Sequence, residues 1–143
     1  MNIYQTAREA RGITQEKAAE LLGISVESLR AYECGRRLPP TAVVVGMVDV
    51  YDTQFLAYQH LKRDSIADGL LPDISEKTMA EAVLSLIKEI ADTKELLPTL
   101  ISIASDGVID EAERPAWEKI KKEFGDVVQS YYCLIVSNKT RGE

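Results

Sequence analysis

Residues 12–35 carry two short helical patterns separated by a glycine, and this segment constrains the fold more than any other. Thr14 and Ser25 are good N-cap residues, and each precedes a run compatible with a helix, at 15–22 and 26–34. Gly23 suits a left-handed backbone conformation, which glycine adopts at little cost. The pattern predicts a helix-turn-helix, the arrangement that places its second helix in the major groove of DNA.

Apolar residues in the two patterns predict how this turn is held together. Leu21 and Leu22 can pack against Ile24 and Leu29, and the small side chain of Ala19 lets the two helices approach closely. The outer face and N-terminal end of the second helix then present Val26, Glu27, Ser28, Arg30 and Ala31.

The rest of the N-terminal part also has helical patterns, at 3–11, 42–51 and 54–62. The run Val43-Val44-Val45 would by itself favour a strand. Thr41, as a cap after two prolines, and the helical neighbours favour a helix instead. We therefore predict a five-helix domain over residues 1–63.

A linker is predicted at 64–74, where Asp68-Gly69 and Pro72 signal turns. A long amphipathic helix opens at Ser75, is broken at Pro98, and is followed by a final helix at about 111–136. The sequence thus predicts an all-α chain in which a helix-turn-helix domain precedes a helical hairpin in residues 75–143.

Charge is divided unevenly between these two parts. Residues 1–63 carry eight Lys or Arg and seven Asp or Glu, whereas residues 64–143 carry nine and sixteen. The net charges are therefore +1 and -7, which sum to the -6 of the chain. A net charge of +1 is low for a DNA-binding domain, so DNA affinity has to come from individually placed residues.

From other sequence features we expect a cytoplasmic protein. The first residues lack the basic and apolar regions of a signal peptide, and no stretch approaches the ~20 apolar residues of a membrane span. Cys34 and Cys133 fit no metal-binding spacing and are expected to be free thiols in a reducing compartment.

Residues 3–62 resemble the lambda-repressor/Cro-type helix-turn-helix domains of the XRE family. The resemblance is carried by a set of residues in matching register, which comprises Arg8, Gly12-Ile13-Thr14-Gln15, Ala18-Ala19, Leu22-Gly23-Ile24-Ser25, Leu29, Tyr32-Glu33, Gly35 and Pro39.

This resemblance implies a role for each matching position. Gln15 would reach a DNA phosphate, helped by the amides at the start of its helix. Arg8 and Glu33 would form an internal salt bridge. The remaining positions would contact bases or the DNA backbone, and they are Ser25, Val26, Glu27, Ser28, Arg30, Ala31, Arg36 and Arg37.

Three of these positions depart from the family pattern. Val26 and Ala31 are apolar, so they can touch a thymine methyl group but cannot read a base by hydrogen bonds. Glu27 would be repelled by phosphates, although it can accept a hydrogen bond from a cytosine amino group. An alternative is therefore a protein-interaction module, such as an antitoxin or an adaptor, with weak or no DNA binding.

The resemblance also bears on assembly and on the class of protein. Cro-type proteins bind double-stranded DNA as symmetric dimers, so residues 75–137 are expected to form a homodimer or to bind a protein partner. The alternative for this region is that it completes the core of a monomer. We expect a repressor of phage-like or mobile-element type.

Catalytic and metal-binding patterns find little support. His60 is remote in sequence from both cysteines, and no Gly-rich phosphate loop or zinc motif is present. The segment 106–113 resembles the second half of an EF-hand loop, but Ala104 stands where a ligand is needed. Asp110 and Glu113 are instead expected to form a capping box. We expect no enzyme activity and no cofactor.

Overall fold

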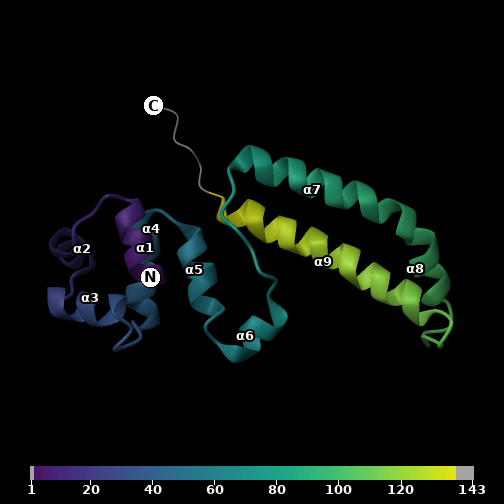
Figure 1. Cartoon of the computed structure of the whole chain (residues 1–143), viewed down its shortest axis with the longest axis horizontal. Helices are drawn as coiled ribbons and strands as arrows, with labels where there is room; N and C mark the ends of the chain where they lie inside the picture. Colours follow the sequence, from purple (N-terminus) through teal and green to yellow (C-terminus); the bar gives the residue numbers. More distant parts are fainter. Residues whose placement is uncertain (1, 138–143) are drawn as a thin grey trace. The chain divides into compact units, whose positions relative to one another are not determined.

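The computed structural model describes residues 2–137, and within this range the secondary structure is entirely helical (Figure 1). The prediction of an all-α fold is confirmed. The chain divides between Leu71 and Pro72 into two compact units, which are described separately below. No helix in the described range is long and apolar enough to cross a bilayer.

The first unit contains the five predicted helices and one more. Their caps follow the local sequence: Thr14 Oγ1 accepts a hydrogen bond from Lys17 N at 3.2 Å, and Ser25 Oγ accepts one from Ser28 N at 3.1 Å. Gly23 adopts φ 64°, the left-handed conformation expected at the turn. The helices are α1 (Ile3–Ala10), α2 (Gln15–Leu22), α3 (Val26–Glu33), α4 (Thr41–Tyr51), α5 (Gln54–Leu61) and α6 (Ser65–Leu70).

Helices α1, α2, α3, α4 and α5 share a single hydrophobic core. Its largest fully buried side chains are Tyr4, Leu29, Met47 and Leu56, which come from four different helices. The valine run is helical because Val44 faces this core, so tertiary packing overrides the β-propensity. Thr41, which was predicted to cap this helix, is instead its first residue, and Pro40 occupies the N-cap position without a side-chain hydrogen bond.

The predicted linker at 64–74 contains a short helix, because α6 occupies Ser65–Leu70, and the boundary between the two units also falls within this range. Asp64 caps this helix by accepting hydrogen bonds from Ile66 N and Ala67 N at 2.8 and 3.3 Å. No residue of α6 is buried. The N-cap therefore outweighs the helix-weakening effect of Gly69, although Asp68-Gly69 is typical of a turn.

The second unit is a helical hairpin. Helices α7 (Met79–Thr93) and α9 (Arg114–Val136) lie side by side, and the 3₁₀ helix η1 (Lys94–Leu96) and α8 (Leu97–Ile103) lead from one towards the other (Figure 1). The break falls where Pro98 predicted it, since Pro98 lies in the first turn of α8. Helix α7 begins later than predicted, because Thr78 and Glu81 form a capping box.

The loop before α9 carries reciprocal capping contacts. Glu113 N donates to Asp110 Oδ1 at 2.7 Å, and Asp110 N donates to Glu113 Oε2 at 3.3 Å. This is the capping-box contact that the sequence predicted, although the regular helix starts at Arg114 rather than at about 111.

Much of the apolar stripe of α7 is exposed within the single chain. The helix buries Ala82 and Thr93, whereas several large apolar side chains remain accessible. One neighbouring helix covers only part of the circumference of α7, so the stripe is wider than the contact with α9. The exposed apolar residues of α7 and α9 are Met79, Val83, Leu84, Ile87, Ile90, Val128, Tyr131 and Ile135.

Candidate nucleic-acid interface

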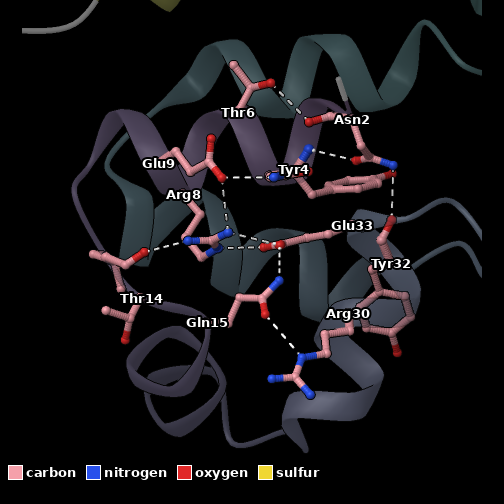
Figure 2. A network of polar contacts seen from close by, with 12 residues as sticks. Asn2, Tyr4, Thr6, Arg8, Glu9, Thr14, Gln15, Arg30, Tyr32 and Glu33 are labelled. Carbon is pink, nitrogen blue, oxygen red and sulfur yellow. Dashed lines mark hydrogen bonds and ion pairs between the residues drawn. The ribbon is translucent and has the colours of Figure 1, made fainter.

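Helix α3 is held in the first unit by an ion pair to α1. Arg8 Nε lies 2.6 Å from Glu33 Oε1, and its Nη2 donates to Glu33 Oε2 at 3.0 Å (Figure 2). Arg8 Nη1 also donates to the carbonyl oxygen of Ile13, the residue that leads into α2. Both charged side chains are buried, and the hydrogen bond to Glu33 raises the pKa of Arg8. The Arg8–Glu33 pair therefore fixes both helices of the helix-turn-helix against α1.

Gln15 lies between this buried pair and the exposed face of α3. Its Nε2 donates to Glu33 Oε2 at 2.8 Å, and its Oε1 accepts a hydrogen bond from Arg30 Nε at 3.1 Å (Figure 2). Arg30 is exposed and also lies 3.6 Å from Glu16 Oε1. The resemblance suggested a phosphate contact for Gln15. The structure adds contacts of this side chain to two other protein groups.

The residues of α3 that were expected to read bases differ in exposure. Glu27 is exposed, and Ser28 and Ala31 are half-buried. Val26 is also half-buried and packs against the hydrophobic core. The expectation that Val26 lies on the open face of α3 is therefore only partly met, because part of its side chain is used for packing.

Arg37 folds back over α3 from the loop that follows it. One of its terminal nitrogens lies 2.8 Å from Tyr32 Oη and 3.4 Å from Ser28 Oγ. Its guanidinium also lies over the Tyr32 ring, 5.0 Å from the ring centroid. Ser28 is linked in turn to the N-cap, since Ser25 Oγ donates to Ser28 Oγ at 3.0 Å.

Arg36 contacts a thiol at the end of α3. Its Nε lies 2.9 Å from Cys34 Sγ, and both residues are exposed. This hydrogen bond lowers the pKa of the Cys34 thiol, since a nearby cation favours the thiolate. Cys133 in contrast is buried in the second unit.

The sequence predicted no role for two further residues of this region. Tyr32 provides the surface on which Arg37 stacks, and Asn2 Nδ2 donates to the carbonyl oxygen of Tyr32 at 3.0 Å. Asn2 also caps α1, since its Oδ1 accepts from Tyr4 N at 3.0 Å. Asparagine directly before a helical pattern is an N-cap signal that can be read from the sequence. The contact of Asn2 with the carbonyl oxygen of Tyr32 depends on the fold and has no such signal.

An acidic cluster in the second unit is a surface ion-pair network. Ligand atoms of Glu89, Glu123 and Asp126 lie within 4.8 Å of one another. Lys88 Nζ lies 3.1 Å from Glu89, and Lys122 Nζ lies 3.0 Å from Asp126. The three carboxylates are half-buried, and these ammonium groups balance their charge, as in ordinary ion pairs on a helix surface.

Comparisons with known proteins agree with this geometry. A family model described as a helix-turn-helix domain matches residues 5–55. The HTH-type transcriptional regulator ImmR of Bacillus subtilis (strain 168) is 33% identical over 107 residues, which cover 73% of this chain and 74% of that protein. No solved structure gives a significant match. The first unit makes up only about half of the chain, so the similarity to ImmR extends into the helical hairpin. The chain therefore belongs to the XRE family of lambda-repressor/Cro-type helix-turn-helix proteins, and it is a DNA-binding transcriptional regulator.

Proposed function

We propose that this protein is a repressor of phage-like or mobile-element type that inserts α3 into the major groove of its operator as a homodimer. The observation that carries the proposal is the placement of α3. The buried Arg8–Glu33 pair holds it rigidly, while Arg30, Arg36 and Arg37 surround its exposed face. Rigid support and exposed cations are what a groove-reading helix needs.

The arginines suit different kinds of contact with DNA. Arg36 extends from the loop after α3 and suits a phosphate contact, which adds affinity for every sequence. Arg37 is held by Tyr32 and Ser28, so it would present a fixed positive charge beside the groove. Glu27 is exposed near the start of α3 and suits recognition of a cytosine amino group. Ser25, Ser28, Val26 and Ala31 complete the surface that would face the bases.

A dimer through residues 75–137 would bury the exposed apolar stripe of the hairpin. Met79, Val83, Ile87 and Ile90 recur at helical spacing on α7, and each is exposed in the single chain. Two hairpins packed through this stripe would resemble a four-helix bundle, which is a stable solution for amphipathic helices. In such a dimer two weak half-site contacts would form on one DNA molecule, so the overall affinity would exceed that of either contact.

The first experiment is selection of bound fragments from genomic DNA at moderate salt, with the molar mass of the protein measured in solution. An inverted repeat bound by a dimer supports the proposal. Arg36→Ala should then weaken binding to all sequences alike and reduce the salt slope by about 0.9, the value for one phosphate contact. Lys119→Ala on α9 removes the same charge from the second unit and should leave both quantities unchanged.

The dimer surface is tested by a charge placed in its centre. Ile87→Asp should convert the dimer to a monomer, because an unpaired carboxylate is costly to bury. Lys88→Gln changes the net charge by the same unit on the polar side of α7 and should leave the dimer intact. Equal molar masses for the two variants would show that the dimer interface does not include this stripe.

The second candidate function is a protein-interaction module, and the exposed apolar stripe on α7 and α9 is the observation that favours it. The apolar Val26 and Ala31 on the recognition helix point the same way. Recovery of no DNA above background, together with a stable complex with another protein, would establish this function in place of repression.

A further inference from the structure

We propose that Gln15 is a positioning residue, which acts on DNA through Arg30 rather than by a contact of its own. The inference rests on the proposed function, because it concerns how α3 presents Arg30 to DNA. It assigns to Gln15 a different role from the phosphate contact that the resemblance implies.

The orientation of the Gln15 amide is fixed from its buried end. Glu33 Oε2 only accepts hydrogen bonds, so the group that lies 2.8 Å from it must be the amide nitrogen of Gln15. Glu33 cannot turn to another partner, because Arg8 holds both of its carboxylate oxygens and its side chain is only 3% exposed. The amide oxygen of Gln15 must therefore face away from Glu33.

This orientation aims an acceptor at the exposed arginine of α3. Gln15 Oε1 accepts a hydrogen bond from Arg30 Nε at 3.1 Å. The guanidinium can only donate, so it requires the amide oxygen of Gln15 on this side, which is the orientation that Glu33 imposes. Figure 2 shows the chain of contacts running from Arg8 through Glu33 and Gln15 to Arg30. The terminal nitrogens of Arg30 lie on the side of the guanidinium away from Gln15 (Figure 2).

The contact matters because an exposed ion pair to Glu16, which restrains Arg30 only weakly, is the other contact of this side chain that the structure gives. A long exposed arginine has many rotamers, and ordering it on DNA costs free energy for each rotamer lost. A hydrogen bond at Nε removes part of this freedom before DNA arrives. One terminal nitrogen also lies 3.6 Å from the exposed carboxylate of Glu16, a weak surface pair that a DNA contact can replace, so the terminal groups can bind a phosphate or a guanine edge. Gln15 thus transmits the rigidity of the buried ion pair to a DNA contact.

The test is a double-mutant cycle on binding to a labelled duplex that carries a site recovered in the fragment selection. Arg30→Ala should weaken binding about tenfold, the scale of one good contact to DNA. Gln15→Met keeps the size of the side chain but cannot hydrogen-bond, and it should cause most of that loss. In the Arg30→Ala background, Gln15→Met should change affinity less than about twofold, within the spread expected for additive sites.

The salt dependence separates positioning from a direct contact. Gln15 is neutral and releases no counterion by itself, so Gln15→Met should lower the salt slope only if it displaces the charge of Arg30. In the free protein, the same variant should speed hydrogen exchange at Arg30 Nε. Lys17→Met, two residues along α2, is the matched control: its effect should be additive with Arg30→Ala and should leave that exchange unchanged.

Two results would overturn the inference, and they differ from the failure of the proposed function. Equal losses in both backgrounds, with an unchanged melting temperature, would assign Gln15 a DNA contact of its own. Equal losses in both backgrounds together with a lower melting temperature would make its role purely structural. If instead the wild-type protein binds no DNA at any salt concentration, the proposed function fails and this inference fails with it.

Discussion

Arg8 and Glu33 pair through two parallel hydrogen bonds of 2.6 and 3.0 Å, although 25 residues separate them in the sequence. Their side chains are 7% and 3% exposed. A bidentate pair of this kind constrains direction as well as distance, so it sets the angle between α1 and α3. The position of the recognition helix thus depends on this buried ionic contact as well as on the core packing of Leu29.

Removing either partner should strongly destabilise the first unit. Glu33→Ala removes the buried partner of the Arg8 guanidinium and leaves it only the half-exposed carboxylate of Glu9 at 3.5 Å, so it should lower the free energy of unfolding by about 3–5 kcal/mol. Urea unfolding followed by circular dichroism measures the change. Lys17→Ala breaks an exposed pair with Glu20 and should cost less than about 1 kcal/mol. A loss for Glu33→Ala no larger than this control would contradict the structural role of the pair.

Tyr51 provides a second test, because its buried hydroxyl has no hydrogen-bond partner among the described residues. Tyr51→Phe removes that hydroxyl, so it should leave stability unchanged or raise it by up to about 1 kcal/mol. Tyr4→Phe is the matched control. Its hydroxyl lies 2.8 Å from His60 Nδ1, and its loss should lower stability by about 1 kcal/mol. Thermal unfolding of both variants gives the comparison.

The same tyrosine predicts a loss of stability in alkali. Burial, and secondly the charge of Glu33, raise the pKa of Tyr51 from 10.0 to about 12. Between these two values the unfolded chain releases the phenol proton and the folded chain keeps it, so stability falls as pH rises. Tyr51→Phe should reduce this slope. An identical slope in the variant would show that other groups cause the alkaline loss.

Local signals in the sequence were sufficient for most of the helix-turn-helix. Thr14 and Ser25 cap the helices they were predicted to cap, since N-cap chemistry depends on neighbouring residues alone. The same reasoning should have found α6, because Asp64 is as good a cap as either of them. Gly69 and Pro72 are turn signals that favour a linker, whereas the Asp64 cap favours the helix that the structure has.

Contacts that depend on the fold could not be read from the sequence in this way. The resemblance named Arg8 and Glu33, but nothing in the spacing of Gln15 and Arg30 shows that Glu33 orients one toward the other. Helical periodicity also marks a face as apolar without saying what covers it. Val26 is covered in part by the core, whereas Ile87 remains exposed in the single chain.

His60 predicts a loss of stability in mild acid. Its burial, and secondly the charge of Arg63, lower its pKa below 6.5. As pH falls below 6.5, the unfolded chain takes up a proton that folded His60 resists, so stability declines until the folded pKa is reached. His60→Asn can still accept from Tyr4 without titrating, and it should flatten this decline. Unfolding free energies at about pH 7.5 and about pH 5.5 test it.

The thiol of Cys34 should react faster than an ordinary cysteine, because its hydrogen bond from Arg36 lowers its pKa and increases the thiolate fraction. In the folded protein, a disulfide reagent should modify Cys34 first and the buried Cys133 only on unfolding. Arg36→Ala should slow the fast phase. Arg37→Ala removes the same charge from the same loop but leaves the contact to Cys34 in place, so it should slow the reaction less. Equal slowing by both variants would assign the reactivity to the general positive potential of the loop instead of the Arg36–Cys34 hydrogen bond.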